Sequence, residues 1–468
     1  MKPPLTSRRH FVAAAGLAAL PLRAQSKREM RIFDARDYGA IGDGVRLDTE
    51  PIQRAIDAAA EHSGPCQVLI RGGKKYLVGT LVLKSGIEFN LADDAELIVS
   101  KDKNHYTSPN GGVLVANDVQ DLKILGTGNI NGRALDFMTE FDKEGEIWKF
   151  GPFRPKIFIL TECKGLDISG IAFSDAPNWG LHMMGCEHVL VDGIKIRNKL
   201  DVPNCDGIDP DHCRDVEIRN CNIVCGDDAI VVKSTREGQK YGPSANISVH
   251  DCVIETKDSG LKIGTETVGD IHDVKFERCE IRSSCRGLTI QQRDEGSVFN
   301  IDFNDIKFVS RYQAAPWWGR GEAISLTAIP RAKGSKVGRI HDIRFRNITG
   351  RAENSVRVNG TAESRISNVS FDNVNLTFER TTTYPGAVYD NRPTSAYPDI
   401  EPHKTPAYNI RHADNVSLTN CSVAWAGTMP DYFTHAVEAE DVTKLTTANF
   451  KGDAAHPGRD AAMMIPKP

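Results

Sequence analysis

Short stretches of alternating apolar and polar residues recur along most of the chain. Each unit has two apolar residues separated by one, followed by polar and turn residues and then another apolar residue. Alternation with a period of two predicts β-strands rather than helices. The units begin, mostly 23 to 31 residues apart, at Leu166, Val189, Val216, Ile247, Val274, Ile301, Ile343, Val369 and Val416.

No unit of this size buries its own apolar face, whereas stacked units close a continuous core and pair every strand with its neighbours. The short strands and the lack of long helical patterns exclude an alternating strand–helix fold. We therefore predict an all-β protein, a right-handed parallel β-helix that forms one domain over residues 31–450, with a tail at 451–468. The longer spacings leave room for loops or for an unrecognised coil.

One segment near the start has helical periodicity. Asp48 and Thr49 precede Pro51, and Ile52 and Ile56 follow on one face. These residues stand in the order typical of a helix start. Because the end of a β-helix exposes an open sheet edge, we predict a short N-terminal capping helix here.

Two residue types occupy fixed positions in the repeat. Cys221, Cys252 and Cys279 are equivalent, and a free cysteine behaves as a small hydrophobe, so an inward stack of thiols is expected. The spacing of the eleven cysteines does not suggest zinc, and both disulfides and reduced thiols remain open. Asparagines two residues after the apolar pair indicate turns with left-handed geometry, at Asn220, Asn347, Asn373 and Asn420.

The N-terminus has the features of a targeting segment. Arg8 and Arg9 precede an apolar run, residues 12–22, that is too short to span a bilayer. This pattern indicates a twin-arginine signal peptide over residues 1–24, with a Sec signal or a short anchor as alternatives. We expect a periplasmic or secreted protein with no membrane association after signal removal. The net charge is −4 and no basic block occurs, so nucleic acid is not an expected partner.

Two carboxylate clusters stand one coil apart. Aligning Ile208 with Ile230 places Asp206 and Asp228 at the same corner of adjacent strands, with Asp227 beside them. Stacked strands lie about 4.8 Å apart, so three carboxyl groups converge and at least one has a raised pKa. A protonated carboxyl beside an ionised one is what glycosidic hydrolysis requires. The alternative is that these aspartates only form turns.

The same alignment places further polar residues along the expected groove. His182, Lys262 and Gln291 face outward in neighbouring coils, as does Lys233. Trp317 and Trp318 stand in a loop between coils, where an indole ring can stack on the C–H face of a sugar.

The motifs around these residues resemble the polygalacturonase family of glycoside hydrolases, family 28. The resemblance covers most of the chain after the signal and is carried by residues 37–44 (DYGAIGDG), Pro177-Asn178-Trp179, Asn204-x-Asp206-Gly207 and Gly226-Asp227-Asp228. It implies that Asp206 is the general acid, that Asp227 and Asp228 position and activate water, and that the reaction inverts the anomeric centre. It also implies a pectic polysaccharide or oligosaccharide as substrate, with no metal or other cofactor, and we expect a monomer.

Two departures from the family pattern bear on the substrate. Asp258-Ser259-Gly260 replaces Gly-His-Gly, and Thr289-Ile290-Gln291 replaces the Arg-Ile-Lys whose cations hold a galacturonate carboxylate. Charge-assisted bonds are strong, so their loss argues against plain polygalacturonate, whereas rhamnogalacturonan hydrolases of the same family also lack these groups. The candidate sugar-binding residues are Asn204, His182, Lys233, Lys262, Gln291, Arg293, Trp317 and Trp318.

Two other functions compete with hydrolysis. A polysaccharide lyase on the same fold would use calcium-bound carboxylates and a basic residue such as Lys233 or Lys262. A non-catalytic carbohydrate-binding β-helix would share the repeat but would not need three converging carboxylates.

Overall fold

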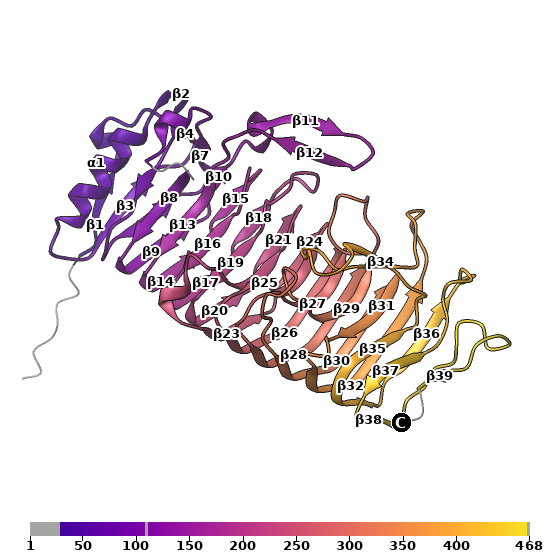
Figure 1. The fold of residues 1–468 in the computed structure, drawn as a ribbon. Coiled ribbons are helices and arrows are strands. Elements are labelled where there is room, and N and C mark those ends of the chain that lie inside the picture. Colours follow the sequence, from indigo (N-terminus) through magenta and orange to yellow (C-terminus); the bar gives the residue numbers. More distant parts are fainter. Residues whose placement is uncertain (1–28, 108–110, 466–468) are drawn as a thin grey trace, which may run out of the picture.

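The computed structural model describes residues 29–107 and 111–465, and its main feature is a parallel β-helix (Figure 1). One sheet of 35 strands runs from β1 (Arg31–Asp34) to β39 (Met463–Met464), and strands of successive coils pair in parallel. Each coil contributes up to three strand segments, which form three rows along the stack. The all-β prediction and the parallel β-helix are confirmed.

The first row carries the outward-facing residues singled out in the sequence. It consists of β5 (Leu81–Val82), β8 (Gly112–Asn117), β13 (Lys156–Thr161), β16 (Leu181–Met184), β19 (Ile208–Asp211), β22 (Ile230–Ser234), β25 (Ser259–Thr267), β27 (Arg286–Gln292), β29 (Glu322–Ala328), β31 (Asn354–Asn359), β35 (Tyr408–Thr419), β37 (Val437–Val442) and β39.

The second row carries the repeated apolar pairs. It consists of β1, β3 (Cys66–Ile70), β6 (Glu88–Leu91), β9 (Gln120–Gly126), β14 (Lys164–Ser169), β17 (Glu187–Asp192), β20 (Arg214–Arg219), β23 (Ser244–His250), β26 (Ile271–Ser284), β28 (Val298–Ser310), β30 (Ile340–Ala352), β32 (Ile366–Glu379), β35 and β38 (Leu445–Ala448).

The third row consists of β2 (Asp43–Leu47), β4 (Lys74–Val78), β7 (Ala95–Val99), β10 (Asn129–Asn131), β15 (Ala172–Ser174), β18 (Lys195–Arg197), β21 (Asn222–Cys225), β24 (Val253–Thr256), the later halves of β26, β28, β30 and β32, and β36 (Ser422–Ala426). Two antiparallel hairpins stand outside the stack, β11 (Met138–Asp142) with β12 (Ile147–Phe150) and β33 (Val388–Asp390) with β34 (Ile400–Pro402). Short 3-10 helices lie at Ala35–Tyr38, Lys103–His105, Ala134–Phe137 and Gln239–Tyr241.

The register follows the sequence repeat coil by coil. Val189 lies opposite Val216, which lies opposite Ile247. The two longest spacings contain loops and no extra coil, because Ile301 pairs directly with Ile343 and Val369 with Val416. The inserted loops cover residues 311–321, 329–339 and 380–407.

Side chains of one kind stack inside the β-helix because equivalent residues repeat at the strand spacing. The rings of Phe303 and Phe345 stack with their centroids 4.9 Å apart. Cys221, Cys252 and Cys279 are buried free thiols in the predicted inward stack, and none of the eleven cysteines, all of them in the described residues, forms a disulfide. The predicted left-handed turns are confirmed, with φ of 56°, 55°, 56° and 54° at Asn220, Asn347, Asn373 and Asn420.

Helix α1 (Thr49–Ala60) covers the N-terminal end of the stack, as predicted (Figure 1). It buries Ile52 and Ile56 completely. Asp48 stands at the N-cap but its side chain does not cap the helix. Its carboxylate instead accepts the backbone N–H groups of Ile41 and Gly42 at 2.8 and 2.9 Å, and so ties the preceding glycine-rich loop to the helix start.

The C-terminal segment differs from the predicted tail. Lys451 pairs with Ser422, and β39 pairs with β37. The sheet therefore continues past residue 450, since β37 leaves an edge that the following residues can pair with. The predicted signal peptide, residues 1–24, lies outside the described residues. Among the residues that are described, no helix is long and apolar enough to cross a membrane.

Candidate active site

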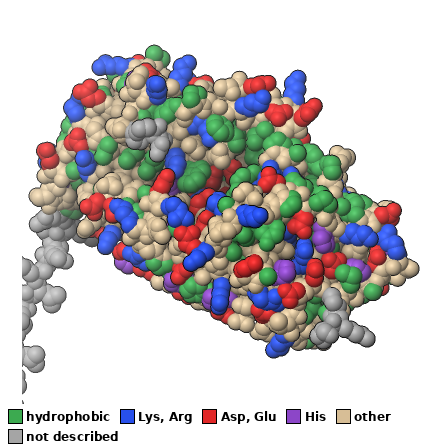
Figure 2. Space-filling model, viewed as in Figure 1, with side chains coloured by type: hydrophobic (Ala, Val, Ile, Leu, Met, Phe, Trp, Pro, Cys, Tyr) green, Lys and Arg blue, Asp and Glu red, His purple; other side chains and the backbone are tan. Residues whose placement is uncertain are grey.

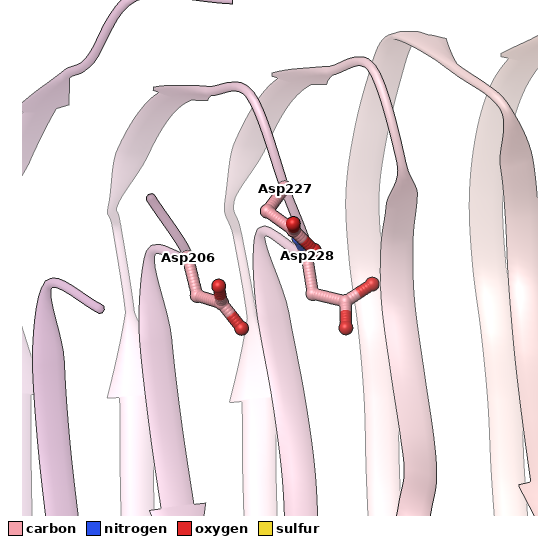
Figure 3. Close-up of side chains that lie close together, drawn as sticks. All are labelled: Asp206, Asp227 and Asp228. Atoms are coloured by element: carbon pink, nitrogen blue, oxygen red, sulfur yellow. The ribbon is translucent and has the colours of Figure 1, made fainter. Parts of the chain in front are cut away.

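Three carboxyl groups converge where two adjacent strands of the first row begin (Figure 3). Asp206 precedes β19, and Asp227 and Asp228 precede β22 in the next coil. Ile208 lies directly opposite Ile230, which brings the two turns together. One oxygen of each carboxyl group lies within 4.8 Å of the others. The backbone register of the repeat is therefore what assembles this acidic cluster.

The cluster lies in a cavity of about 370 Å³. In Figure 2 acidic and basic side chains meet in a depression below the β11–β12 hairpin. The first row of strands forms the floor of the cavity. The β11–β12 hairpin and the loops at 311–321, 329–339 and 380–407 contribute to its walls. The lining residues are Ile147, Trp179, Pro203, Asn204, Asp206, Asp227, Asp228, Lys233, Asp258, Lys262, Thr265, Glu266, Pro316, Trp317, Trp318, Arg331 and Pro393.

Lys262 is paired with one member of the cluster. Its Nζ lies 2.6 Å from Oδ2 of Asp228, and both side chains are buried. A charge-assisted bond of this length holds the carboxylate in a fixed position. Oδ1 of Asp228 has no partner among the described residues. Asp228 is therefore held against Lys262 through one oxygen, while its other oxygen has no hydrogen-bond partner.

Asp206 has a different environment. Burial, together with the neighbouring carboxylates of Asp209 and Asp227, raises its pKa well above the usual range. Lys233 opposes this effect, but its Nζ lies 3.7 Å from Asp206 and is shared with Asp209 and Glu266. A carboxyl group with a raised pKa retains a proton that it can donate.

Asp227 is fixed by the backbone. Its Oδ2 accepts the N–H of Asn204 and its Oδ1 accepts the N–H of Asp228, both at 2.9 Å. Burial and the adjacent Asp228 raise its pKa. Asn204 stands in a left-handed conformation with φ 57°, and its side-chain oxygen accepts a bond from Arg154 at 3.0 Å. Asn204 thus orients Asp227 from within the pocket wall.

A fourth carboxyl group, Asp258, lines the same cavity. It is buried, and burial followed by the charges of Asp228 and Asp227 raises its pKa to about 8. It therefore holds its proton at neutral pH. Asp209, which lies beneath the cavity, has a pKa raised to about 7 by burial.

Five of the eight predicted sugar-binding residues line the cavity. They are Asn204, Lys233, Lys262, Trp317 and Trp318. Trp317 is buried, and its indole Nε1 has no hydrogen-bond partner among the described residues.

His182 does not line the cavity. Its Nε2 lies 3.3 Å from Asp211, its Nδ1 lies 3.1 Å from Nζ of Lys156, and its ring packs edge-on against Trp179. Burial lowers its pKa to about 4. The structure therefore makes His182 a neutral support for Trp179 and Lys156, which differs from the predicted place in the groove.

Gln291 and Arg293 do not reach the cavity either. Arg293 is fully buried and donates to Thr327 and to the backbone carbonyl of Asn391. Gln291 is also buried and donates to the carbonyl of Arg392 at 3.3 Å. The prediction that they face the groove is wrong because the 380–407 loop covers this part of the strand row.

Sequence reasoning missed Glu266 and Arg331. Glu266 lies 3.4 Å from Nζ of Lys233, and Arg331 makes two bonds to Asp294, at 2.7 and 2.8 Å. Burial raises the pKa of Glu266, but the three nearby cations outweigh it and hold the value at about 2. Arg331 stands in a loop outside the repeat, so the sequence contained no signal for it. Glu266 lies in β25, but the register between β22 and β25 shifts just before it, so alternation alone does not place it.

The chain belongs to glycosyl hydrolases family 28, whose family model matches residues 63–388. A probable polygalacturonase of Vitis vinifera is 28% identical over 274 residues, which cover 54% of this chain and 56% of that protein. A probable polygalacturonase of Arabidopsis thaliana is 26% identical and covers 58% of each. The chain thus spans a little over half the length of these two relatives.

Other relatives match over more of their length. An exopolygalacturonase of Zea mays is 25% identical over 78% of this chain and 88% of its own. Two solved structures share the fold. A family 28 exopolygalacturonase of Yersinia enterocolitica has a TM-score of 0.67 at 17% identity, covering 91% of this chain and 78% of its own. An exopolygalacturonase of Thermotoga maritima has a TM-score of 0.62 at 21% identity, covering 74% and 87%.

Proposed function

We propose that this protein hydrolyses O-glycosidic bonds of a pectic polysaccharide. The observation that carries the proposal is the pairing of a carboxylate held by Lys262 with a carboxyl group of raised pKa in one cavity. Family membership supports the same reaction and does not favour the lyase or the non-catalytic alternatives.

The geometry suggests a role for each carboxyl group. Asp206 donates its proton to the glycosidic oxygen as the bond to the anomeric carbon breaks. Asp228 accepts a proton from the attacking water, while Asp227 orients that water. Asp227 suits positioning better than proton donation because both of its oxygens already accept backbone N–H groups.

The stereochemical outcome is part of the proposal. Family resemblance points to inversion, for which carboxyl groups typically stand about 6.5–9.5 Å apart. The nearest oxygens here lie within 4.8 Å, which is closer to the spacing of about 5–5.5 Å that is typical of retaining enzymes. Inversion therefore rests on the family rather than on the spacing. NMR of the first product formed from an oligosaccharide measures it directly.

Substrate choice follows from the charges in the cavity. Lys262 faces Asp228, Lys233 lies among Asp206, Asp209 and Glu266, and Arg331 is bound to Asp294. Each cation that lines the cavity thus already faces a carboxylate. We propose that unmodified polygalacturonate is a poor substrate and that a rhamnogalacturonan-type or otherwise branched pectic chain is preferred.

The deciding experiment compares purified protein on polygalacturonate, rhamnogalacturonan and aryl glycosides, with and without EDTA. Hydrolysis that survives EDTA supports the metal-independent proposal. Products that absorb as unsaturated uronides would instead establish a lyase. An activated aryl leaving group needs little protonation, so it should rescue Asp206→Asn more than Asp228→Asn. Rescue of Asp227→Asn instead would transfer the acid role to Asp227.

We further propose that the protein acts after export, in the periplasm or outside the cell. The support is the twin-arginine pattern of residues 1–24. Fusing residues 1–28 to a reporter that is active only after folding in the cytoplasm tests the route, with Arg8→Lys/Arg9→Lys as the control.

A further inference from the structure

In the first row of strands, which forms the floor of the cavity, the environment of the outward-facing side chains changes beyond β25. The outward-facing Lys233 of β22 and Lys262 of β25 are buried but line the cavity, whereas the outward-facing residues of the next three strands are buried and none of them lines it. In β13, on the other side of the cavity, the outward-facing Ile159 and Thr161 are partly exposed. The groove is therefore covered in the C-terminal direction and open in the N-terminal direction. The buried outward-facing residues are Thr289, Gln291, Ser325, Thr327, Arg357 and Asn359.

The cover is the 380–407 loop, and it is anchored by buried cations. Nη2 of Arg357 donates to Oδ1 of Asn391 at 2.7 Å, and Nη2 of Arg293 donates to the carbonyl of the same residue at 3.0 Å. Arg392 binds Asp390 through two nitrogens and also donates to the carbonyl of Trp317 at 2.7 Å. These contacts join the 380–407 loop to the 311–321 loop and form an end wall for the groove.

The β11–β12 hairpin adds a side wall that reaches the same loop. At its tip, Glu146 accepts a bond from Nζ of Lys257 at 3.0 Å and one from the hydroxyl of Tyr384 at 2.6 Å. The next residue, Ile147, lines the cavity. Figure 1 shows the hairpin projecting along the rim of the stack toward the later coils. The hairpin and the loop, 238 residues apart at this contact, thus enclose the C-terminal end of the cavity together.

We propose that the enclosed end admits only a terminus of the substrate chain, so that the protein removes units from chain ends and does not cut internally. The inference rests on the proposed hydrolysis. A chain that continued past the carboxylates would have to pass through the wall held by Arg357 and Arg392. The chain end enters the cavity, and the remainder leaves over β16 and β13.

End-labelled oligosaccharides of increasing length test this proposal, using the pectic substrate that the protein cleaves fastest. The expected result is that each oligosaccharide yields one short product and a remainder that is shortened from a single end. On polymer, reducing ends should accumulate while viscosity stays nearly constant. A ladder of internal products and an early loss of viscosity would overturn the proposal while leaving hydrolysis established. Absence of any hydrolysis would remove both the proposed function and this inference.

Two variants test which elements build the wall. Replacing residues 393–398 by two glycines shortens the loop but keeps Asp390 and Arg392, and should raise the viscosity loss per bond cleaved several-fold. Glu146→Ala/Tyr384→Phe releases the hairpin tip and should also raise the viscosity loss per bond cleaved. Glu144→Gln, an exposed position of the same turn, is the matched control and should behave as wild type. Unchanged end cleavage in both variants, with thermal unfolding that shows them folded, would contradict the role of these elements.

Discussion

The first row of strands contains two regions with the same backbone register. One region lines the cavity, and the other is covered by a loop. In β22 and β25, the outward-facing Lys233 and Lys262 line the cavity, beside Asp206 and Asp228 in the turns that precede β19 and β22. In β27, β29 and β31, outward-facing residues are covered, and Arg293 donates into the covering loop. Equivalent strand positions therefore line the cavity where no loop covers them and stabilise the fold where a loop does.

Removing a carboxyl group of the open region should have the largest effect. General acid–base catalysis contributes about 10²–10⁴-fold, so Asp206→Asn and Asp228→Asn should each lower kcat by roughly that factor. Urea unfolding of Asp206→Asn should remain near wild type, because the neighbouring carboxylates repel the charge of Asp206. Asp228→Asn should be less stable, because it leaves the buried Lys262 without its counter-ion. Asp305→Asn, at a left-handed turn that suits Asn, is the control. A full-activity Asp206→Asn protein would contradict the assigned role.

Removing the counter-ion of Asp228 should change the pH profile of kcat/KM. The charge of Lys262 lowers the pKa of Asp227, so Lys262→Met should raise that pKa and move the acid limb to higher pH. The alkaline limb reports the raised pKa of Asp206, above which the acid has lost its proton. The alkaline limb should move less than the acid limb. Lys262→Arg should restore part of the profile, while the exposed Lys307→Met should leave it unchanged. An unshifted acid limb in Lys262→Met would argue against the role of Lys262.

The covered region should respond in the opposite way. Arg293→Ala leaves buried acceptors in Thr327 and Asn391 without a donor, at about 1–3 kcal/mol for each such group. We expect about 2–4 kcal/mol lower stability in urea unfolding and little change in KM for a short oligosaccharide. A raised KM at unchanged stability would show that Arg293 contacts substrate and would break the comparison.

The smallest expected effect concerns Asp258. The folded protein holds its proton up to a pKa of about 8, well above that of an unfolded aspartate, so its contribution to stability is lost as pH rises from about 4 through 8. Asp258→Asn mimics the protonated form and should remove this part of the pH dependence. Urea unfolding at several pH values measures it. Parallel stability curves for wild type and variant would show that Asp258 does not titrate in this range.

The sequence by itself determined the repeat and everything that depends on it. Alternation with a period of two gave the strands, and the equivalence of Ile208 and Ile230 placed Asp206 beside Asp228. Cys252 and Asn373 were assigned correctly because their environments are set by their own coil and its neighbours. In a stacked fold, such contacts repeat at a fixed spacing and are visible in one dimension.

The tertiary structure decided which parts of that row remain open. The placement of Gln291 and Arg293 depends on contacts with loop residues 101 and 98 positions later, and Glu146 contacts Tyr384 across 238 residues. Contacts that loops make follow no periodic pattern, because loops connect the coils without sharing their register. The same holds for Arg331, whose charge enters the cavity from a loop outside the repeat. The repeat thus fixed where the carboxyl groups stand, and the inserted loops fixed the shape of the cavity around them.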